Sequence, residues 1–218
     1  MLLACVIALA AGCDRLFDLR PVPDGRAICF ADDFTTDVID SDHWTSIDDM
    51  AGSTVAQTGA RLVFTLAANV SYAEIYSPAL DLTDTAIELE LIQAPPVEDG
   101  YHEFGMEIAN DSDNAYTLFS AGGDLFFRQR VMRSNDDTMI QLNVTHRYLR
   151  IRHESASATV HFETSSDNSA WIDHRSVAAT VVVSLARAKI YAGTYQVPAQ
   201  PSTAVFDDFQ LTGRCPPL

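Results

Sequence analysis

Two pairs of glutamates occur in segments where apolar residues fill the alternate positions. One leucine separates Glu88 from Glu90, and the triplet Phe-Gly-Met separates Glu103 from Glu107. In an extended chain, residues an even number of positions apart point to the same face. Two carboxyl groups on one face, about 5 to 5.5 Å apart, can hydrolyse a glycosidic bond with retention of configuration. The four glutamates are therefore the candidate catalytic residues of the chain.

Arginines in comparable positions offer a structural explanation for the same glutamates. Arg150 and Arg152 also alternate with apolar residues. Arg128 and Arg130 follow Phe126-Phe127 at alternate positions, so we expect all four arginines on outward strand faces beside the glutamates. Ion pairs on a strand surface stabilise a fold by only about 0 to 1 kcal/mol each. We favour this ladder of ion pairs over catalysis, and the sequence therefore argues against an enzyme more than for one.

The same kinds of residue could bind a sugar without cleaving it. The guanidinium groups of Arg150 and Arg152 match the carboxylates of uronic or sialic acids, and exposed aromatic rings stack on sugar faces. The candidate ligand-binding residues are Arg150, Arg152, Tyr148, Glu103, Glu107 and Tyr116. Gly105, between two outward glutamates, indicates either the close approach of another group or a β-bulge.

Two aspartate pairs near the ends of the chain are candidate metal ligands. Asp32 and Asp33 would meet Asp207 and Asp208 if the terminal strands pair. Ca²⁺ takes several carboxylate oxygens at about 2.3 to 2.6 Å, so this cluster has suitable chemistry for a structural calcium site. Calcium is the only cofactor that the sequence suggests. The six histidines are scattered and lack the spacing of a zinc site.

Composition limits the partners of the chain. Its 218 residues are 47% hydrophobic, which is ample for a packed core, and its net charge is −16. An acidic surface of this size repels phosphate groups, which argues against nucleic acid and anionic lipid as partners. The charge is compatible with divalent cations or with simple solubility.

Short β-branched and aromatic runs, separated by Gly, Pro, Asn and Asp, fill the chain from Ile28 onward, and no amphipathic helix is evident. This pattern predicts an all-β protein, and so many strands in one domain imply two stacked antiparallel sheets, a β-sandwich. The predicted strands are Ile28–Phe34, Arg61–Leu66, Tyr72–Ser77, Ala86–Gln93, His102–Ala109, Tyr116–Ser120, Leu125–Met132, Met139–Asn143, Tyr148–His153, Thr159–Glu163, Trp171–Arg175, Thr180–Ala186, Ile190–Gly193 and Ala204–Leu211.

Alternation within these segments predicts which side chains face the core. The expected core residues are Ile87, Leu89, Leu91, Phe104, Met106, Ile108, Leu149 and Ile151. The candidate glutamates and arginines occupy the positions between them, and therefore the outward faces.

The N-terminal residues are organised around a cysteine. Residues 1–12 are apolar and uncharged, too few to span a membrane that needs about 20 helical residues. They end in Ala10-Ala11-Gly12 before Cys13, and charged residues follow at once. This series resembles the lipobox of bacterial lipoproteins, in which the cysteine is lipidated and becomes the new N-terminus. The resemblance implies a signal peptide at residues 1–12 and a lipid anchor on Cys13.

The residues that follow Cys13 are predicted to form a linker to the folded domain. Residues 13–27 contain Pro21, Pro23 and Gly25, which are typical of an extended tether. Leu2-Leu3-Ala4-Cys5 is an alternative lipobox, but processing there would leave an apolar tail on the mature protein. With Cys5 removed and Cys13 lipidated, two cysteines remain.

These two cysteines flank the predicted domain. Cys29 stands near the start of the first predicted strand and Cys215 follows the last. A bridge between them would close nearly the whole domain as one loop, which the chain-entropy model values at about 4 to 5 kcal/mol. An oxidising, extracytoplasmic setting favours this disulfide.

Five motifs occur in order along the domain: FADDF at 30–34, Trp44, LRIR at 149–152, SSDNSAW at 165–171 and FDDF at 206–209. The series resembles the concanavalin A-like lectin/glucanase domains, LamG-like jelly rolls, of bacterial surface proteins. We assign this domain to residues 28–215. In such domains the first and last strands lie side by side, which implies that Cys29 lies near Cys215.

The laminarinase-like branch of that fold carries its acids on one strand as Glu-x-Asp-x-x-Glu or Glu-x-Asp-x-Glu. At the nearest match, residues 88–93, Glu90 stands in place of the central Asp and Gln93 in place of the last acid. The proton donor of such an enzyme would then be missing.

We interpret the chain as a non-catalytic binding module, lipid-anchored in the bacterial cell envelope on the extracytoplasmic side, with a glycan or polysaccharide as its expected ligand. The membrane is contacted through the lipid anchor alone, and no nucleic acid is bound. One alternative is a glycoside hydrolase or lyase that uses Glu88 and Glu90, or Glu103 and Glu107. The other is a structural or protein-interaction lipoprotein.

Overall fold

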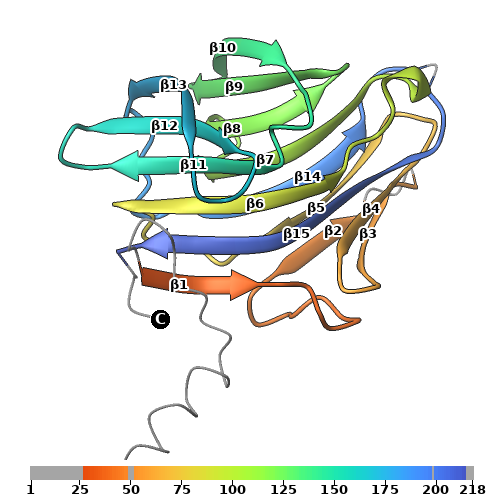
Figure 1. Cartoon of the computed structure of the whole chain (residues 1–218), viewed down its shortest axis with the longest axis horizontal. Coiled ribbons are helices and arrows are strands. Elements are labelled where there is room, and N and C mark those ends of the chain that lie inside the picture. The colour runs from red at the N-terminus through yellow and green to blue at the C-terminus, as the bar shows by residue number, and fades with distance from the viewer. Residues whose placement is uncertain (1–26, 49–51, 198, 215–218) are drawn as a thin grey trace, which may run out of the picture.

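The computed structural model describes residues 27–48, 52–197 and 199–214. The predicted signal peptide, Cys5, the lipid attachment at Cys13 and the predicted disulfide partner Cys215 lie outside the described residues. The described chain forms two antiparallel sheets stacked face to face (Figure 1). The prediction of an all-β, two-sheet β-sandwich of the jelly-roll type is confirmed.

The first sheet, sheet A, has the order β13-β12-β11-β6-β15-β4-β3, and β1 also pairs with β15. Its strands are β1 (Ala27–Asp32), β3 (Thr54–Gln57), β4 (Leu62–Leu66), β6 (Thr85–Gln93), β11 (Tyr148–Glu154), β12 (Thr159–Ser165), β13 (Ile172–Ala178) and β15 (Ser202–Gly213). Because β1 runs antiparallel to β15, the first and last described strands lie side by side, as the resemblance implies.

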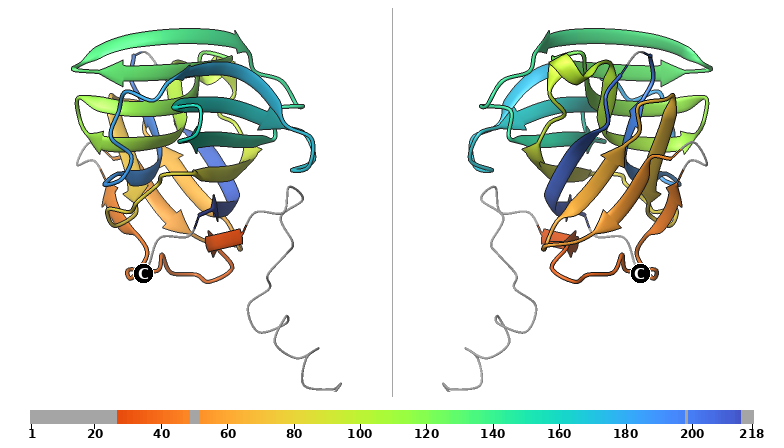
Figure 2. Two further views of the ribbon diagram at one scale, coloured as in Figure 1. Left: turned by 90° about the vertical axis from the view of Figure 1, so that its left-hand side faces the viewer. Right: turned by 90° about the vertical axis from the view of Figure 1, so that its right-hand side faces the viewer.

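The second sheet, sheet B, has the order β10-β9-β8-β7-β14-β5-β2. Its strands are β2 (Thr45–Asp48), β5 (Ser71–Tyr76), β7 (His102–Asp111), β8 (Asn114–Ala121), β9 (Asp124–Val131), β10 (Ser134–Gln141) and β14 (Arg187–Thr194). One turn of 3-10 helix, η1 (Val97–Asp99), lies between β6 and β7. The end views in Figure 2 show the two sheets as separate layers.

The core fills the space between the sheets. The expected core residues of β6, β7 and β11 are buried there, apart from Leu91, which is half-buried at the end of β6. Aromatic rings join the layers: Phe104 of sheet B packs against Phe206 of sheet A, and Phe127 against Phe162. Period-two alternation therefore identified the inward faces correctly.

Three segments differ from the predicted strands. Residues 180–186 form a loop with a single bridge at Ala186, although Val181 and Val183 are buried. The loop is held by individual hydrogen bonds, among them one from the Val181 amide to the Tyr116 hydroxyl (2.9 Å). The short strands β2 and β3 were not predicted, because their sequences mix Ser, Thr, Asp and Gln with few apolar residues.

Candidate functional site

A groove of about 700 Å³ runs along the outer face of sheet B. It is lined by side chains from β5, β7, β8, β9 and β14, with Ile47 of β2 at one edge. These side chains alternate with core residues along each strand, so a single strand contributes both the core and the groove. Strand pairing arranges the groove side chains in three rows that cross the sheet.

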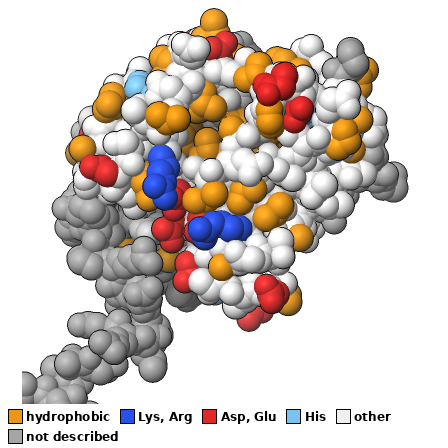
Figure 3. All heavy atoms as spheres, turned by 45° about the vertical axis from the view of Figure 1, so that its right-hand side comes forward, with side chains coloured by type: hydrophobic (Ala, Val, Ile, Leu, Met, Phe, Trp, Pro, Cys, Tyr) orange, Lys and Arg blue, Asp and Glu red, His pale blue; other side chains and the backbone are white. Residues whose placement is uncertain are grey.

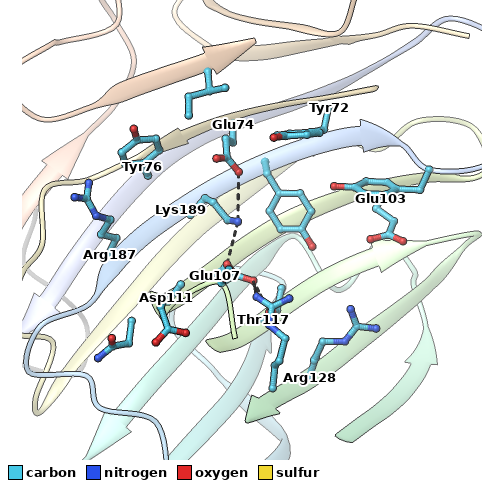
Figure 4. A pocket seen from close by; sticks show the side chains of 17 residues that line it. Tyr72, Glu74, Tyr76, Glu103, Glu107, Asp111, Thr117, Arg128, Arg187 and Lys189 are labelled. Atoms are coloured by element: carbon cyan, nitrogen blue, oxygen red, sulfur yellow. Dashed lines mark hydrogen bonds and ion pairs between the residues drawn. The ribbon is translucent and has the colours of Figure 1, made fainter. Parts of the chain in front are cut away.

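The first row is polar. Its members stand opposite one another in register: Tyr76, Lys189, Glu107, Thr117, Arg128 and Asp137. Lys189 lies between Glu107 and Glu74, with its Nζ 2.9 Å from Glu107 Oε1 and 3.3 Å from Glu74 Oε2 (Figure 4). Burial disfavours the charged ammonium group, but the two carboxylates outweigh it and raise the pKa of Lys189.

Both oxygens of Glu107 have partners. Oε1 faces Lys189, and Oε2 accepts hydrogen bonds from Arg130 Nη2 (3.0 Å) and Thr117 Oγ1 (2.9 Å). The residue is only 4% exposed. Protein donors engage both oxygens of this buried carboxylate, so Glu107 is poorly placed to contact a ligand.

The second row is mainly aromatic, and its members Glu74 and Tyr191 line the groove. Its members are Glu74, Tyr191, Gly105, Phe119 and Phe126 in register. Phe119 stacks on Phe126 at 4.9 Å, and Tyr191 belongs to the same small apolar cluster. A Cβ on Gly105 would lie 2.3 Å from the carbonyl oxygen of Leu118. The close approach that Gly105 indicated is therefore that of strand β8, and no ligand is needed to explain it.

The third row contains the second groove glutamate. Its members are Tyr72, Gly193, Glu103 and Ala121. In the described part of the chain, Glu103 has neither a hydrogen-bond partner nor an ion-pair partner. Burial raises its pKa, and the charge of Arg128 offsets this only in part. Arg128 itself is bound to Asp137 by two hydrogen bonds of 2.8 Å.

Two tyrosines border the Glu103 end of the groove. Tyr72 and Tyr195 are 40% and 39% exposed. A Cβ on Gly193 would lie 3.0 Å from Tyr195 Cε2 and 2.7 Å from Tyr72 Cβ, so the absence of a side chain there lets the Tyr195 ring fold over the strand. Burial raises the pKa of Tyr195, and the charge of Glu103 raises it further.

The predicted ligand-binding residues do not form one site. Arg150, Arg152 and Tyr148 lie on the outer face of sheet A, whereas Glu103 and Glu107 lie on the outer face of sheet B. On the face shown in Figure 3, basic side chains lie against acidic ones and do not form a patch of one sign.

The two arginines of β11 are committed to internal ion pairs. Arg150 donates to Glu163 Oε2 (2.6 Å) and to Glu88 Oε1 (3.5 Å), and Arg152 donates to Glu163 Oε1 (3.1 Å). The Trp171 ring covers the Arg150 guanidinium group at 3.9 Å. These guanidinium groups are therefore engaged and not available to the carboxylate of an acidic sugar. The predicted ladder is found in part, because Arg150 contacts Glu88, but the main partner of both arginines is Glu163, which was not among the predicted glutamates.

Tyr116 is a correction to the predicted site. It is fully buried between the sheets, next to Phe162, and its hydroxyl accepts from the Val181 amide. Its register partner is the core residue Ile108, which places it on the inward face of β8. A ligand in the groove cannot reach it.

The first candidate catalytic pair, Glu88 and Glu90, is also engaged. Each is 3% exposed, and Arg147 Nε lies 2.5 Å from Glu90 Oε1. The Thr212 hydroxyl donates to Glu88 at 3.3 Å, in addition to the contact with Arg150. Neither carboxylate faces an open groove, so the structure argues against this pair as catalysts.

Asp32, Asp33 and Asp208 line one pocket, but the four predicted calcium ligands do not form a metal site. Asp32 accepts from the Phe34 amide and from Trp44 Nε1, both at 2.8 Å, and Asp207 forms an ion pair with Arg61. The backbone of β15 is irregular at Asp208 (φ 45°), which interrupts its register with β6. Within the described ranges, no group of three or more His, Cys, Asp or Glu side chains is arranged to hold a metal ion.

Sequence reasoning missed most of the groove. The missed residues are Tyr72, Glu74, Tyr76, Arg187, Lys189, Tyr191 and Tyr195. A signal was present, since tyrosines and charged residues recur at every second position in Tyr72–Tyr76 and in Arg187–Tyr191. Their proximity follows only from the pairing of β14 with both β5 and β7.

No family model matches this sequence, and no curated protein is similar enough to match. Solved structures do match in fold. One belongs to the endo-acting O-glycanases that human gut bacteria express to initiate mucin breakdown, with a TM-score of 0.64 and 10% identity over 85% of this chain and 98% of that one.

Among the described residues, no helix has the length and apolar character needed to cross a membrane.

Two mycobacterial structures also match in fold. A glycoside hydrolase family protein from Mycobacterium thermorestibile has a TM-score of 0.61 and 13% identity, over 84% of this chain and all of that one. A pseudo β-1,3-glucanase of Mycobacterium tuberculosis has a TM-score of 0.61 and 10% identity, over 85% and 98%. The chain therefore has the lectin/glucanase-like β-sandwich fold, as the sequence resemblance implies.

Proposed function

We propose that this protein is a non-catalytic glycan-binding module whose site is the groove on the outer face of sheet B. The groove combines exposed tyrosines with hydrogen-bonding charged groups, which is the composition that suits a sugar with apolar faces and hydroxyl edges. The fold similarity to glycoside hydrolases and glucanase-like proteins supports a carbohydrate ligand at the level of the fold.

The state of Glu107 carries the argument for binding over cleavage. A hydrolase of this type uses two carboxyls, one of which must give or take a proton. Lys189, Arg130 and Thr117 occupy both oxygens of Glu107. Figure 4 shows that the carboxylates of Glu103 and Glu107 are not turned toward one another. Of the two glutamates proposed as this catalytic pair, Glu103 alone lacks a hydrogen bond or ion pair among the described residues, and one such carboxyl does not make a catalytic pair.

One observation favours a hydrolase as the second candidate. Burial raises the pKa of Glu103, whereas Glu107 lies between two cations. Opposite environments for two carboxyls are the arrangement that divides acid and base roles in glycosidases. The four-residue spacing between Glu103 and Glu107 argues against a hydrolase. It separates the two Cα atoms by about 13 Å along the strand, and carboxyls that cooperate lie about 5 to 9.5 Å apart.

A panel of polysaccharides tests the proposal directly. A soluble Leu16–Leu218 protein is incubated with each polysaccharide, and both retention and release of reducing ends are measured. Retention without release is expected, and Tyr195→Ala should weaken it because the rim ring is lost. Release of reducing ends that Glu103→Gln abolishes would establish the hydrolase instead. A folded protein that retains no glycan would refute the proposal in favour of a protein-binding role.

The membrane attachment belongs to the same proposal. We propose that Cys13 carries the lipid and that the module therefore works in the bacterial cell envelope. The full chain expressed in a bacterium with lipoprotein processing should partition into detergent with its N-terminal fragment acylated, and Cys13→Ser should release it. Cys5→Ser should leave the anchoring unchanged. Soluble full-length protein without acylation would overturn this assignment.

A further inference from the structure

Glu103 is the exception among the carboxylates of the groove. Glu107 and Glu74 each face the ammonium group of Lys189, and Asp111 accepts hydrogen bonds from the Asp113 amide and the Asn114 side chain. Glu103 has no such partner among the described residues. The half-buried Glu103 carboxylate loses hydration, and the charge of Arg128 offsets this loss only in part.

The register of β7 explains why Glu103 is left open to a ligand. Its cross-strand neighbours are Gly193 on one side and Ala121 on the other, and Gly105 is the next outward residue along β7. None of these side chains is long enough to cover a carboxylate. Glu103 therefore lies at the bottom of a notch in the sheet surface.

Aromatic residues border this notch on its outer sides. Tyr191 and Phe119 flank Gly105 in the neighbouring strands, and Tyr101 packs against the same apolar cluster. Tyr195 folds over Gly193, which stands directly opposite Glu103. Lys189 and Arg128 already lie over the Tyr191 and Phe119 rings. The rings left for a ligand are those of Tyr195 and Tyr101, and a carboxylate beside them suits an ammonium group, because it compensates the charge and ring faces attract cations.

Electrostatics beyond the notch favour a cation as well. The chain carries a net charge of −16, which draws cations toward its surface. The charge of Arg128 acts on Glu103, but Arg128 is bound to Asp137 by two hydrogen bonds and lies over the Phe119 ring at 4.6 Å. Among the described residues it forms no hydrogen bond or ion pair with Glu103, so a ligand cation can still contact that carboxylate.

We propose that the notch at Glu103 binds a protonated amine, and that the glycan held in the groove is one with free amino groups, of the glucosamine class. This inference rests on the proposed glycan-binding function and adds the chemical class of the ligand. The Tyr72 and Tyr195 rings contact the sugar ring at the rim, and Glu103 pairs with its amine.

The test compares two oligosaccharides that differ only at nitrogen. Titration calorimetry at a pH where the amine is protonated measures the affinity of a glucosamine hexamer and of its N-acetylated counterpart. We expect the free amine to bind at least about tenfold tighter, since a charged hydrogen bond replaces a neutral one. Its affinity should also fall as sodium chloride rises from 50 to 500 mM.

Two variants that lose one negative charge separate the site from the overall charge. Glu103→Gln should weaken the glucosamine hexamer about tenfold and leave the acetylated hexamer within twofold. Glu98→Gln, an exposed residue of η1 outside the groove, should change neither.

The outcomes keep the two proposals apart. Equal affinity for both hexamers, unchanged by Glu103→Gln, would overturn the amine subsite and leave glycan binding intact. Absence of binding to any glycan in the panel would overturn the glycan function itself. A lysine-rich peptide that binds as tightly as the glucosamine hexamer, and equally needs Glu103, would overturn the assignment of an amino sugar.

Discussion

The ion pair between Glu107 and Lys189 is the main support for the proposal that the groove binds a glycan without cleaving it. If Glu107 is held between cations as a structural group, its removal should cost stability as well as binding. The relevant contacts are 2.9 Å to Lys189, 3.0 Å to Arg130 and 2.9 Å to Thr117. Hydrogen bonds to a charged group are worth about 1.5 to 3 kcal/mol when buried.

Partial exposure reduces these values. The side chains of Lys189 and Arg130 are 25% and 23% exposed, whereas that of Glu107 is 5% exposed. We therefore expect Glu107→Gln to lower the free energy of unfolding by about 2 to 3 kcal/mol, and Lys189→Met by about 1 to 2 kcal/mol. For a chain of this size, 2 to 3 kcal/mol corresponds to a fall in Tm of about 4 to 12 °C.

Urea unfolding of the four proteins in a double-mutant cycle measures the coupling between the two side chains. We expect a coupling energy of about 1 kcal/mol with unchanged m values. Single-variant effects that add to within about 0.3 to 0.5 kcal/mol would refute the reasoning, because Glu107 would then not depend on Lys189. Since the folded protein raises the pKa of Lys189, this contribution is present at neutral pH and should disappear as the pH rises through that raised pKa.

Three further predictions concern the scaffold. Gly105→Ala should destabilise the protein by about 1 to 3 kcal/mol or more, because the added Cβ meets the backbone of β8; an unchanged Tm would contradict the close packing of these strands. Tyr116→Phe should cost about 1 to 2 kcal/mol through the unpaired Val181 amide, while glycan retention stays the same. Burial lowers the pKa of four histidines, namely His102, His146, His153 and His174. The free energy of unfolding should therefore decline as the pH falls below about 6.5, because the unfolded chain binds protons more readily than the folded protein. Equal urea midpoints at pH 7.5 and pH 5 would argue against this.

The predicted disulfide adds a test of the domain ends. Cys29 lies in β1, with its Sγ 3.8 Å from the carbonyl oxygen of Gly213 in β15. Mass spectrometry of the protein digested without reduction should yield a peptide that joins Cys29 to Cys215. Cys215→Ser should lower stability by about 4 kcal/mol. Free thiols on both residues in protein made under oxidising conditions would contradict the prediction.

The fold could be predicted because the alternation of apolar and polar residues within each strand indicates which side chains face the core. Leu89 and Ile151, for example, alternate with charged residues, and their burial follows from the two-residue period alone. The same rule predicted a strand at residues 180–186, where the structure has a loop. Val181 and Val183 are buried at alternate positions without a partner strand, so the same apolar pattern arises from side-chain packing alone.

The site could be predicted only in part, because the sequence pattern of one strand does not indicate which other strands pair with it. Glu103 and Glu107 were identified from their spacing on one strand. Arg150 was placed with them because its strand shows the same alternation, yet it belongs to the opposite sheet. Tyr116 could not be oriented, since β8 is buried on both faces and its pattern does not distinguish core from groove.

The antiparallel pairing of β1 with β15 has a consequence for the architecture of larger proteins. Ala27 stands directly opposite Gly213, so the chain enters and leaves the fold at one point. A domain of this kind can be inserted into a surface loop of a host protein with little distortion of the host. It can also be circularly permuted, with a short linker from 213 to 27 and new ends in the exposed turn at residues 155–158. Such rearranged genes would keep the groove of sheet B unchanged.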